Sequence, residues 1–321
     1  MTLNHHLAGS QMHVHGLMLV ATLLVATSFP VAAAITEGLD TLVLTFLRFA
    51  LATALFGPLV FWSHGLKLPS ATDLLRYSAL SLLLVTFFIC MFVSLHFTTP
   101  LNTAAIFALH PVITAFLAAL LLRETLSTTA RFALPIGAVG AIWVVFRGDL
   151  EALLALEVGQ GDVIFLAGTL ALAAYSTLIK VLHRGEPMAV MTFWILATGT
   201  VWLFAFSALR LGEVEWQQVS GSIWAGIAYL SVFTTIVTFF LVQWNTTKIG
   251  PTRVASYTFL NPGLVVVLSI ALGAPLPPSA TWPGMLLTLL AVIVLQFHGT
   301  CDTTPGQGVR DPGRTKRGVK C

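Results

Sequence analysis

The sequence predicts an all-α membrane protein in which ten transmembrane helices form two inverted five-helix repeats. Hydrophobic residues make up 57% of the 321 residues, charged residues only 9%, and the mean hydropathy is +0.90. A soluble domain carries about 25% charged residues. Ten apolar stretches are long enough to cross a bilayer, and one segment of the first half recurs in the second. These stretches occupy most of the chain and leave no room for a soluble catalytic domain.

The ten expected spans follow from the length of the apolar runs. The hydrocarbon core is about 30 Å thick, so a spanning helix needs about 20 mainly apolar residues. The fifth and tenth runs are short. The expected spans are 14–35, 41–62, 77–95, 101–122, 130–146, 163–182, 188–209, 223–243, 254–272 and 282–298.

The distribution of basic residues predicts the orientation, because loops rich in Lys and Arg stay in the cytoplasm. With the N-terminus inside, 13 of the 16 lysines and arginines fall on the cytoplasmic side and Arg48 lies inside a span. Only Arg147 and Arg210 fall on the opposite side, where acidic residues are common. Both termini are therefore expected in the cytoplasm.

An internal repeat relates the fourth and ninth spans. Pro100 aligns with Pro251 and Pro111 with Pro262, both at an offset of 151 residues. Because five spans separate the copies, the second copy enters the membrane from the opposite face. Such inverted repeats are typical of secondary transporters. The expected units are a first repeat at 1–147, a second at 148–298, and a disordered basic cytoplasmic tail at 299–321.

Four segments together resemble the EamA family of the drug/metabolite transporter superfamily. Their order and spacing cover almost the whole chain, although the second repeat lacks the Gly-Glu pair that usually ends its fourth span; Gly273 is followed by Ala274. The segments are LTFLRF (44–49), PVITAFLAALLLRETL (111–126), Gly161–Asp162 and IGPTRVASYTFLNP (249–262).

The resemblance implies that the ten helices, in two inverted five-helix repeats, surround a central cavity. It also implies a bacterial inner-membrane transporter that exports small metabolites, amino acids or amphipathic compounds by alternating access. The alternative within the superfamily is a nucleotide-sugar or sugar-phosphate carrier. Those carriers bind multiply charged substrates and would need several buried basic residues, whereas Arg48 is the only charged residue deep within an expected span. The expected partners are a small-molecule substrate and the lipid bilayer.

Arg48 is the first candidate binding residue, because it is the charged residue deepest within an expected span. It lies about 10 Å below the outer end of that span at 1.5 Å per residue. A charge at such depth usually faces a cavity or a partner group. Arg48 is either a binding cation for a carboxylate or a structural arginine that bonds backbone carbonyls.

Two prolines break the fourth and ninth spans near their midpoints, after His110 and Asn261. A proline in a helix leaves the carbonyl four residues earlier without its usual donor, and broken helices at this depth often line transport sites. His110 and Asn261 are therefore candidate binding residues. The alternative is a kink relieved by neighbouring helices, with His110 bonded inside the bundle.

Tyr175, Tyr257 and Ser28 complete the candidate binding set. The tyrosines lie in mid-span and could stack on a substrate or bond it, while packing with a satisfied hydroxyl is the alternative. Arg123 and Glu124 end the fourth span, where gating or capping is expected rather than substrate contact. Gly137 and Gly140 allow close helix approach, either for packing within the chain or in a homodimer.

The sequence carries no pattern typical of an enzyme, a metal site or a nucleic-acid-binding protein. No Asp or Glu occurs at mid-depth in any expected span, and the cysteines lack metal-ligand spacing. His5, His6, His13 and His15 are interpreted as part of a solvated N-terminal tail rather than as a metal patch. We therefore expect no enzymatic activity and no cofactor.

Overall fold

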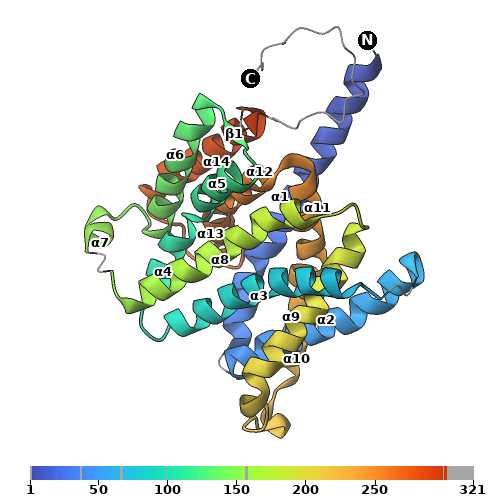
Figure 1. The fold of residues 1–321 in the computed structure, drawn as a ribbon. Coiled ribbons are helices and arrows are strands. Elements are labelled where there is room, and N and C mark those ends of the chain that lie inside the picture. Colours follow the sequence, from blue (N-terminus) through green and yellow to red (C-terminus); the bar gives the residue numbers. More distant parts are fainter. Residues whose placement is uncertain are drawn as a thin grey trace, which may run out of the picture.

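The computed structural model describes residues 2–36, 38–65, 68–98, 100–155, 158–298 and 300–301. Within these ranges the protein is almost entirely helical (Figure 1). The elements are α1 (Thr2–Thr36), α2 (Thr41–His64), α3 (Ala71–Ser94), α4 (Pro100–Phe107), α5 (His110–Leu121), β1 (Thr125–Leu126), α6 (Thr128–Val145), α7 (Leu150–Leu154), α8 (Gln160–Leu182), α9 (Met188–Leu211), η1 (Trp216–Gln218), α10 (Gly221–Tyr229), η2 (Leu230–Val237), α11 (Thr238–Ile249), α12 (Pro251–Ser256), η3 (Tyr257–Leu260), α13 (Asn261–Ala271), α14 (Thr281–His298) and β2 (Thr300–Cys301).

The helices correspond to the ten expected spans. Nine helical segments of the described residues are long and apolar enough to cross a bilayer, and a tenth apolar helix, Thr281–Phe297, is shorter. Many large apolar side chains on the outside of the bundle are exposed, among them Leu209 (88%) and Phe297 (78%). In water such a surface would be unfavourable. It suits contact with lipid chains.

Successive spans cross the bundle in opposite directions, so the connections between spans gather at its two ends. We call the end that carries the α2–α3, α5–α6, α8–α9 and α11–α12 connections the basic face. Its described basic residues are Arg76, Arg123, Arg131, Lys180, Arg184, Lys248 and Arg253. We call the opposite end, with Asp40, Asp149, Asp162, Glu213 and Glu215, the acidic face. The first half enters from the basic face and the second, starting at α8, enters from the acidic face.

The third span begins earlier in the structure than the sequence predicts. Helix α3 starts at Ala71 rather than at residue 77, because Ser70 caps it by accepting a hydrogen bond from the Asp73 N–H at 3.2 Å. Arg76 therefore lies inside the helix and is 7% exposed. Its guanidinium contacts Glu186 at 2.9 Å and the carbonyl of Leu182 at 2.6 Å. Ionic and carbonyl partners make this buried position tolerable.

Glycines bring α6 and α14 into close contact, and Figure 1 shows the two helices (green and red) side by side. A Cβ atom added at Gly140 would lie 2.9 Å from the Leu287 Cβ, and one at Gly284 would lie 2.9 Å from the Gly140 carbonyl oxygen. A Cβ at Gly137 would lie 2.6 Å from the Phe259 ring. The two glycines of α6 thus serve packing within the chain, which removes them as support for a homodimer.

The fourth and ninth spans are both interrupted just before their prolines. Helix α4 ends at Phe107 and α5 begins at His110, while α12 passes through the 3₁₀ segment η3 before α13 begins at Asn261. Pro111 and Pro262 occupy the first turn of the second piece, where the missing N–H costs no internal bond. Each interruption leaves a polar residue, His110 or Asn261, at the start of a new helix.

The C-terminal tail was expected to be disordered from residue 299. Residues 300–301 instead form strand β2, which pairs antiparallel with β1 so that Thr125 faces Cys301. The rest of the expected tail, residues 302–321, lies outside the described residues.

Candidate functional site

A cavity of about 340 Å³ lies inside the bundle, with walls from both halves of the chain. All six residues of the candidate binding set line it. They are Ser28 (α1), Arg48 (α2), His110 (α5), Tyr175 (α8), Tyr257 (η3) and Asn261 (α13). The volume suits a ligand of small-metabolite size.

Arg48 is held against the eighth span. Its Nε donates to the Thr235 Oγ1 at 2.5 Å and its Nη2 to the Thr234 carbonyl at 3.1 Å. The guanidinium carbon lies 5.7 Å from the centroid of the Phe88 ring, a cation–π arrangement. Nη1 has no hydrogen-bond partner among the described residues. Arg48 thus bonds a backbone carbonyl, as expected of a structural arginine. It also has a free donor in a cavity, as expected of a binding cation.

His110 and Asn261 each carry a buried polar atom that no described group satisfies. The His110 ring is stacked on Phe107 with 5.6 Å between centroids, and its Nδ1 lacks a partner. Its Nε2 lies 3.4 Å from the Thr114 Oγ1. The Asn261 Oδ1 also lacks a partner. Buried polar groups are nearly always paired in folded proteins, so these two atoms are available to a ligand or to water.

The two tyrosines are tied to neighbours by their hydroxyl groups. The Tyr175 hydroxyl accepts a hydrogen bond from the Gln243 Nε2 at 2.9 Å, and the Gln243 Oε1 accepts one from Thr192 at 2.8 Å. The Tyr257 hydroxyl lies 2.8 Å from the His15 Nδ1. The interpretation of His15 as part of a solvated tail is wrong, because α1 extends through it and places its ring against the second half.

Ser28 lines the cavity, but its hydroxyl is already used. The Ser28 Oγ donates to the Val25 carbonyl of its own helix at 2.6 Å. Such a bond occupies the only proton of the hydroxyl and leaves its oxygen as an acceptor. Ser28 can therefore contact a ligand only as an acceptor unless this bond breaks.

The remaining wall is mostly apolar and aromatic. It includes Phe87, Phe88, Phe92, Phe107 and Phe239. Among the described residues that line the cavity Arg48 is the sole charged side chain, with no aspartate or glutamate beside it. In a low-dielectric pocket an uncompensated cation attracts an anion much more strongly than in water. The arrangement suits a ligand with one anionic group and an apolar body.

Sequence reasoning missed the residues that hold the candidate binding set in place, above all Thr235 and Gln243. Both are fully buried and bond cavity-lining side chains. The role of Gln243 could have been predicted from the sequence, because an amide in an apolar span usually bonds another helix. The role of Thr235 could not have been predicted, since threonine is common in spans and this role depends on the π-helical geometry of η2.

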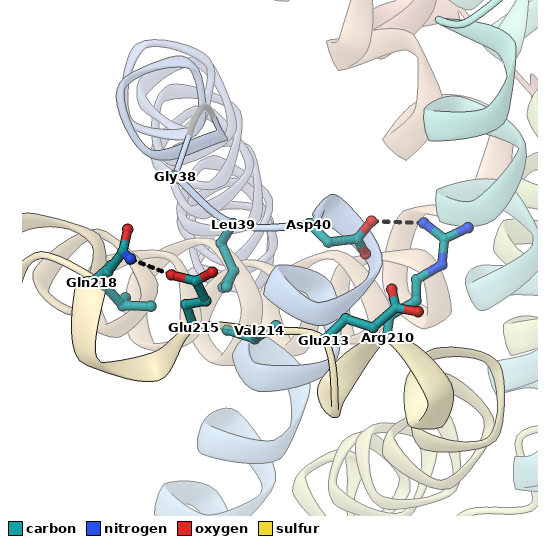
Figure 2. Close-up of a pocket in the computed structure, with 9 residues that line it drawn as sticks. Gly38, Leu39, Asp40, Arg210, Glu213, Val214, Glu215 and Gln218 are labelled. Atoms are coloured by element: carbon teal, nitrogen blue, oxygen red, sulfur yellow. Dashed lines mark hydrogen bonds and ion pairs between the residues drawn. The ribbon is translucent and has the colours of Figure 1, made fainter.

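A second hollow, of about 780 Å³, opens at the acidic face between the α1–α2 connection and the segment after α9 (Figure 2). The Arg210 Nη1 lies 2.6 Å from the Asp40 Oδ2, so the two halves meet in an ion pair here. Glu215 accepts a hydrogen bond from Gln218. The described lining contains three carboxylates and one arginine, so acidic side chains outnumber basic ones around this hollow.

Comparison with known proteins decides the family. The sequence profile of the EamA-like transporter family matches residues 14–146 and again residues 159–297. The chain belongs to this family. It is a multi-pass membrane transporter built of two related halves, and not an enzyme.

Relatives of this EamA-like transporter occur in bacteria and archaea. It is 25% identical over 236 residues to the uncharacterized transporter YyaM of Bacillus subtilis, covering 71% of this chain and 76% of the relative. An uncharacterized transporter of Archaeoglobus fulgidus is 26% identical over 279 residues, covering 87% and 95%. A crystal structure described only as that of a protein has a TM-score of 0.71 at 17% identity, over 88% of this chain and 97% of the other. That likeness shows the fold alone.

Proposed function

We propose that this EamA-like transporter exports a small monoanionic or zwitterionic molecule with an apolar body, such as an amino acid, across the bacterial inner membrane. Export proceeds by alternating access, with the basic face and both termini in the cytoplasm. The supporting observation is Arg48, whose Nη1 has no partner among the described residues, in a largely apolar cavity whose described lining includes no acidic residue. A carboxylate would satisfy this donor.

The other polar groups of the cavity support a zwitterionic or amide-bearing ligand. The Asn261 Oδ1 is an unsatisfied acceptor, and the His110 Nδ1 accepts or donates according to its tautomer. An ammonium or amide N–H on the ligand would pair with Asn261 while a carboxylate pairs with Arg48. In this proposal Tyr175, Tyr257 and Ser28 form part of the cavity wall around the apolar body of the ligand.

The nucleotide-sugar or sugar-phosphate alternative is less well supported. A phosphate ester carries about two negative charges and is usually bound by several basic groups or a nest of N–H donors. The described lining offers one guanidinium. Single-cation recognition suits a monoanion better.

The test is counterflow in proteoliposomes with a mixed amino-acid panel, comparing the wild-type protein with Arg48→Ala. We expect exchange of one class of amino acids, and its loss in Arg48→Ala without loss of folded protein in the membrane. Undiminished exchange by Arg48→Ala would remove Arg48 from the site. Exchange of phosphorylated sugars but not of amino acids would favour the alternative carrier.

A further inference from the structure

The way in which Arg48 is bonded leaves one particular edge of its guanidinium free. Nε and Nη2 form the side-on edge, and both donate to the eighth span, to the Thr235 Oγ1 and the Thr234 carbonyl. Nη1 and the second proton of Nη2 form the end-on edge. A guanidinium has five N–H donors in a fixed fork and binds a carboxylate with two parallel bonds along one edge. The end-on edge is therefore the one that remains for a ligand.

A departure from α-helical bonding at the end of η2 creates the acceptor for Nη2. In an α-helix the Thr234 carbonyl would accept the N–H of Thr238, four residues on. Here the Thr238 N–H donates to the Thr235 carbonyl. This bond, which runs only three residues back, leaves the Thr234 carbonyl to the Arg48 Nη2, which donates to it at 3.1 Å. Short π-helical segments are rare and are frequently found at functional sites.

Thr235 supplies the second acceptor, and its own proton is committed elsewhere. The Thr235 Oγ1 donates to the Leu230 carbonyl, five residues earlier, at 2.9 Å. A hydroxyl has one proton, so its oxygen faces the Arg48 Nε as an acceptor. Thr235 has 0% exposure and does not line the cavity, whereas Thr234 and Arg48 do. It lies behind the arginine, where a ligand would not touch it.

We propose that Thr235, set by the π-helical turn of η2, is a positioning residue that orients the Arg48 guanidinium end-on toward a ligand carboxylate and so determines selectivity for carboxylates. The inference rests on the proposed role of Arg48 as the anion contact. Without the Thr235 hydroxyl the guanidinium loses one of its two fixed bonds and can rotate about its long side chain. The free edge then points toward the ligand for a smaller fraction of the time.

The experiment compares Thr235→Val with Thr235→Ser in proteoliposomes. Valine keeps the shape of threonine but lacks the hydroxyl, and serine keeps the hydroxyl. Exchange is measured for the best amino acid of the panel and for its carboxamide analogue. We expect Thr235→Val to raise the half-saturation concentration of the acid by about tenfold, as the loss of a hydrogen bond to a charged group predicts, with little change for the carboxamide. Thr235→Ser should stay within about twofold of the wild type.

Thr177→Val is the matched control. Thr177 is also fully buried, and its Oγ1 donates to a carbonyl of its own helix, that of Ala173, at 3.0 Å. It neither lines the cavity nor bonds Arg48. A general packing defect would affect this variant as much as Thr235→Val, and gel filtration in detergent reports whether each variant is folded.

Equal kinetics of Thr235→Val, Thr235→Ser and wild type would overturn the inference, as would equal losses in Thr235→Val and Thr177→Val. If Arg48→Ala still abolishes exchange in that case, the proposed function survives alone. Normal exchange by Arg48→Ala, or no exchange of any amino acid, would overturn the proposed site together with this inference.

Discussion

Glu124 of the first half and Lys180 of the second form an ion pair at the basic face, with 3.2 Å between Oε1 and Nζ. The second oxygen of Glu124 accepts a hydrogen bond from the Thr252 hydroxyl at 3.3 Å. The cluster thus joins α8 and α12 of the second half to the end of α5. On the other side, the cavity lining reaches Thr41, the first residue of α2 at the acidic face. The lining also reaches Val254, in the first turn of α12, so the ion pair lies at the basic-face end of the cavity.

Exchanging the charges of this pair tests whether it is a gate. Glu124→Lys alone should leave two like charges at the contact, open the basic face and lower exchange several-fold, because like charges in a partly buried site repel. Glu124→Lys/Lys180→Glu restores opposite charges and should recover most of the exchange. The measurement is counterflow together with labelling of Val254→Cys, in a cysteine-free background, by a membrane-impermeant thiol reagent added on the basic face.

Labelling should increase in Glu124→Lys and return toward the wild-type rate in the double variant. If the single variant labels no faster than wild type, the pair does not close this face. A double variant as impaired as the single one would show that Glu124 acts through its own bonds rather than through the charge pair.

The Asp40–Arg210 pair at the acidic face should contribute little through its charge. Its side chains are 32% and 50% exposed, and exposed ion pairs contribute about 0–1 kcal/mol. Asp40 also caps α2 by accepting hydrogen bonds from the N–H groups of Leu42 and Val43. Asp40→Asn keeps the cap and should leave the free energy of unfolding nearly unchanged. Asp40→Ala loses the cap and should lower it by about 1 kcal/mol.

Reversible unfolding in detergent, followed by circular dichroism, distinguishes the two contributions of Asp40. Equal destabilisation by Asp40→Asn and Asp40→Ala would mean that the charge contributes more than the cap. Arg210→Gln is the companion variant, and it should behave like Asp40→Asn because it removes the ion pair without touching the helix start.

Gly140→Leu should destabilise the protein, because the new side chain meets α14. Its Cβ would lie 2.9 Å from the Leu287 Cβ and 3.1 Å from the Gly284 carbonyl oxygen. Such overpacking costs about 1–3 kcal/mol of unfolding free energy. Gly16→Ala is the control, since its Cβ would meet nothing within 4 Å. Should Gly140→Leu instead leave stability intact and change the oligomeric mass measured by light scattering, the glycines of α6 would belong to a dimer contact.

Gln243 and Tyr175 should behave as one coupled unit. Removing the Gln243 amide takes away the partner of the buried Tyr175 hydroxyl and leaves the Thr192 hydroxyl only the Met188 carbonyl, which costs about 1–3 kcal/mol. Tyr175→Phe should cost less. In the double variant Tyr175→Phe/Gln243→Leu, the losses should fall short of their sum by about 0.5–3 kcal/mol, the coupling expected for bonded side chains. Strict additivity in detergent unfolding would mean that the bond contributes nothing.

The sequence by itself predicted the fold class, the ten spans, the repetition of the first half in the second, and the proline interruptions. These properties are local, because a chain in hydrocarbon must satisfy its backbone within long apolar helices. Each span is therefore visible as a continuous run. The start of α3 was misplaced because Arg76 looks like a loop residue until its partners Glu186 and Leu182 are known. Those partners are about a hundred residues away in the chain.

Tertiary structure decided what the local pattern cannot contain. Ser28 and Asn261 share a cavity only because helices of opposite halves pack together. The free edge of Arg48 depends on a π-helical turn 187 residues away, and the contact between His15 and Tyr257 spans 242 residues. Hydropathy and charge specify which segments enter the membrane and which loops share a face. They do not specify which side chains meet inside it, because that depends on the packing of one helix against another.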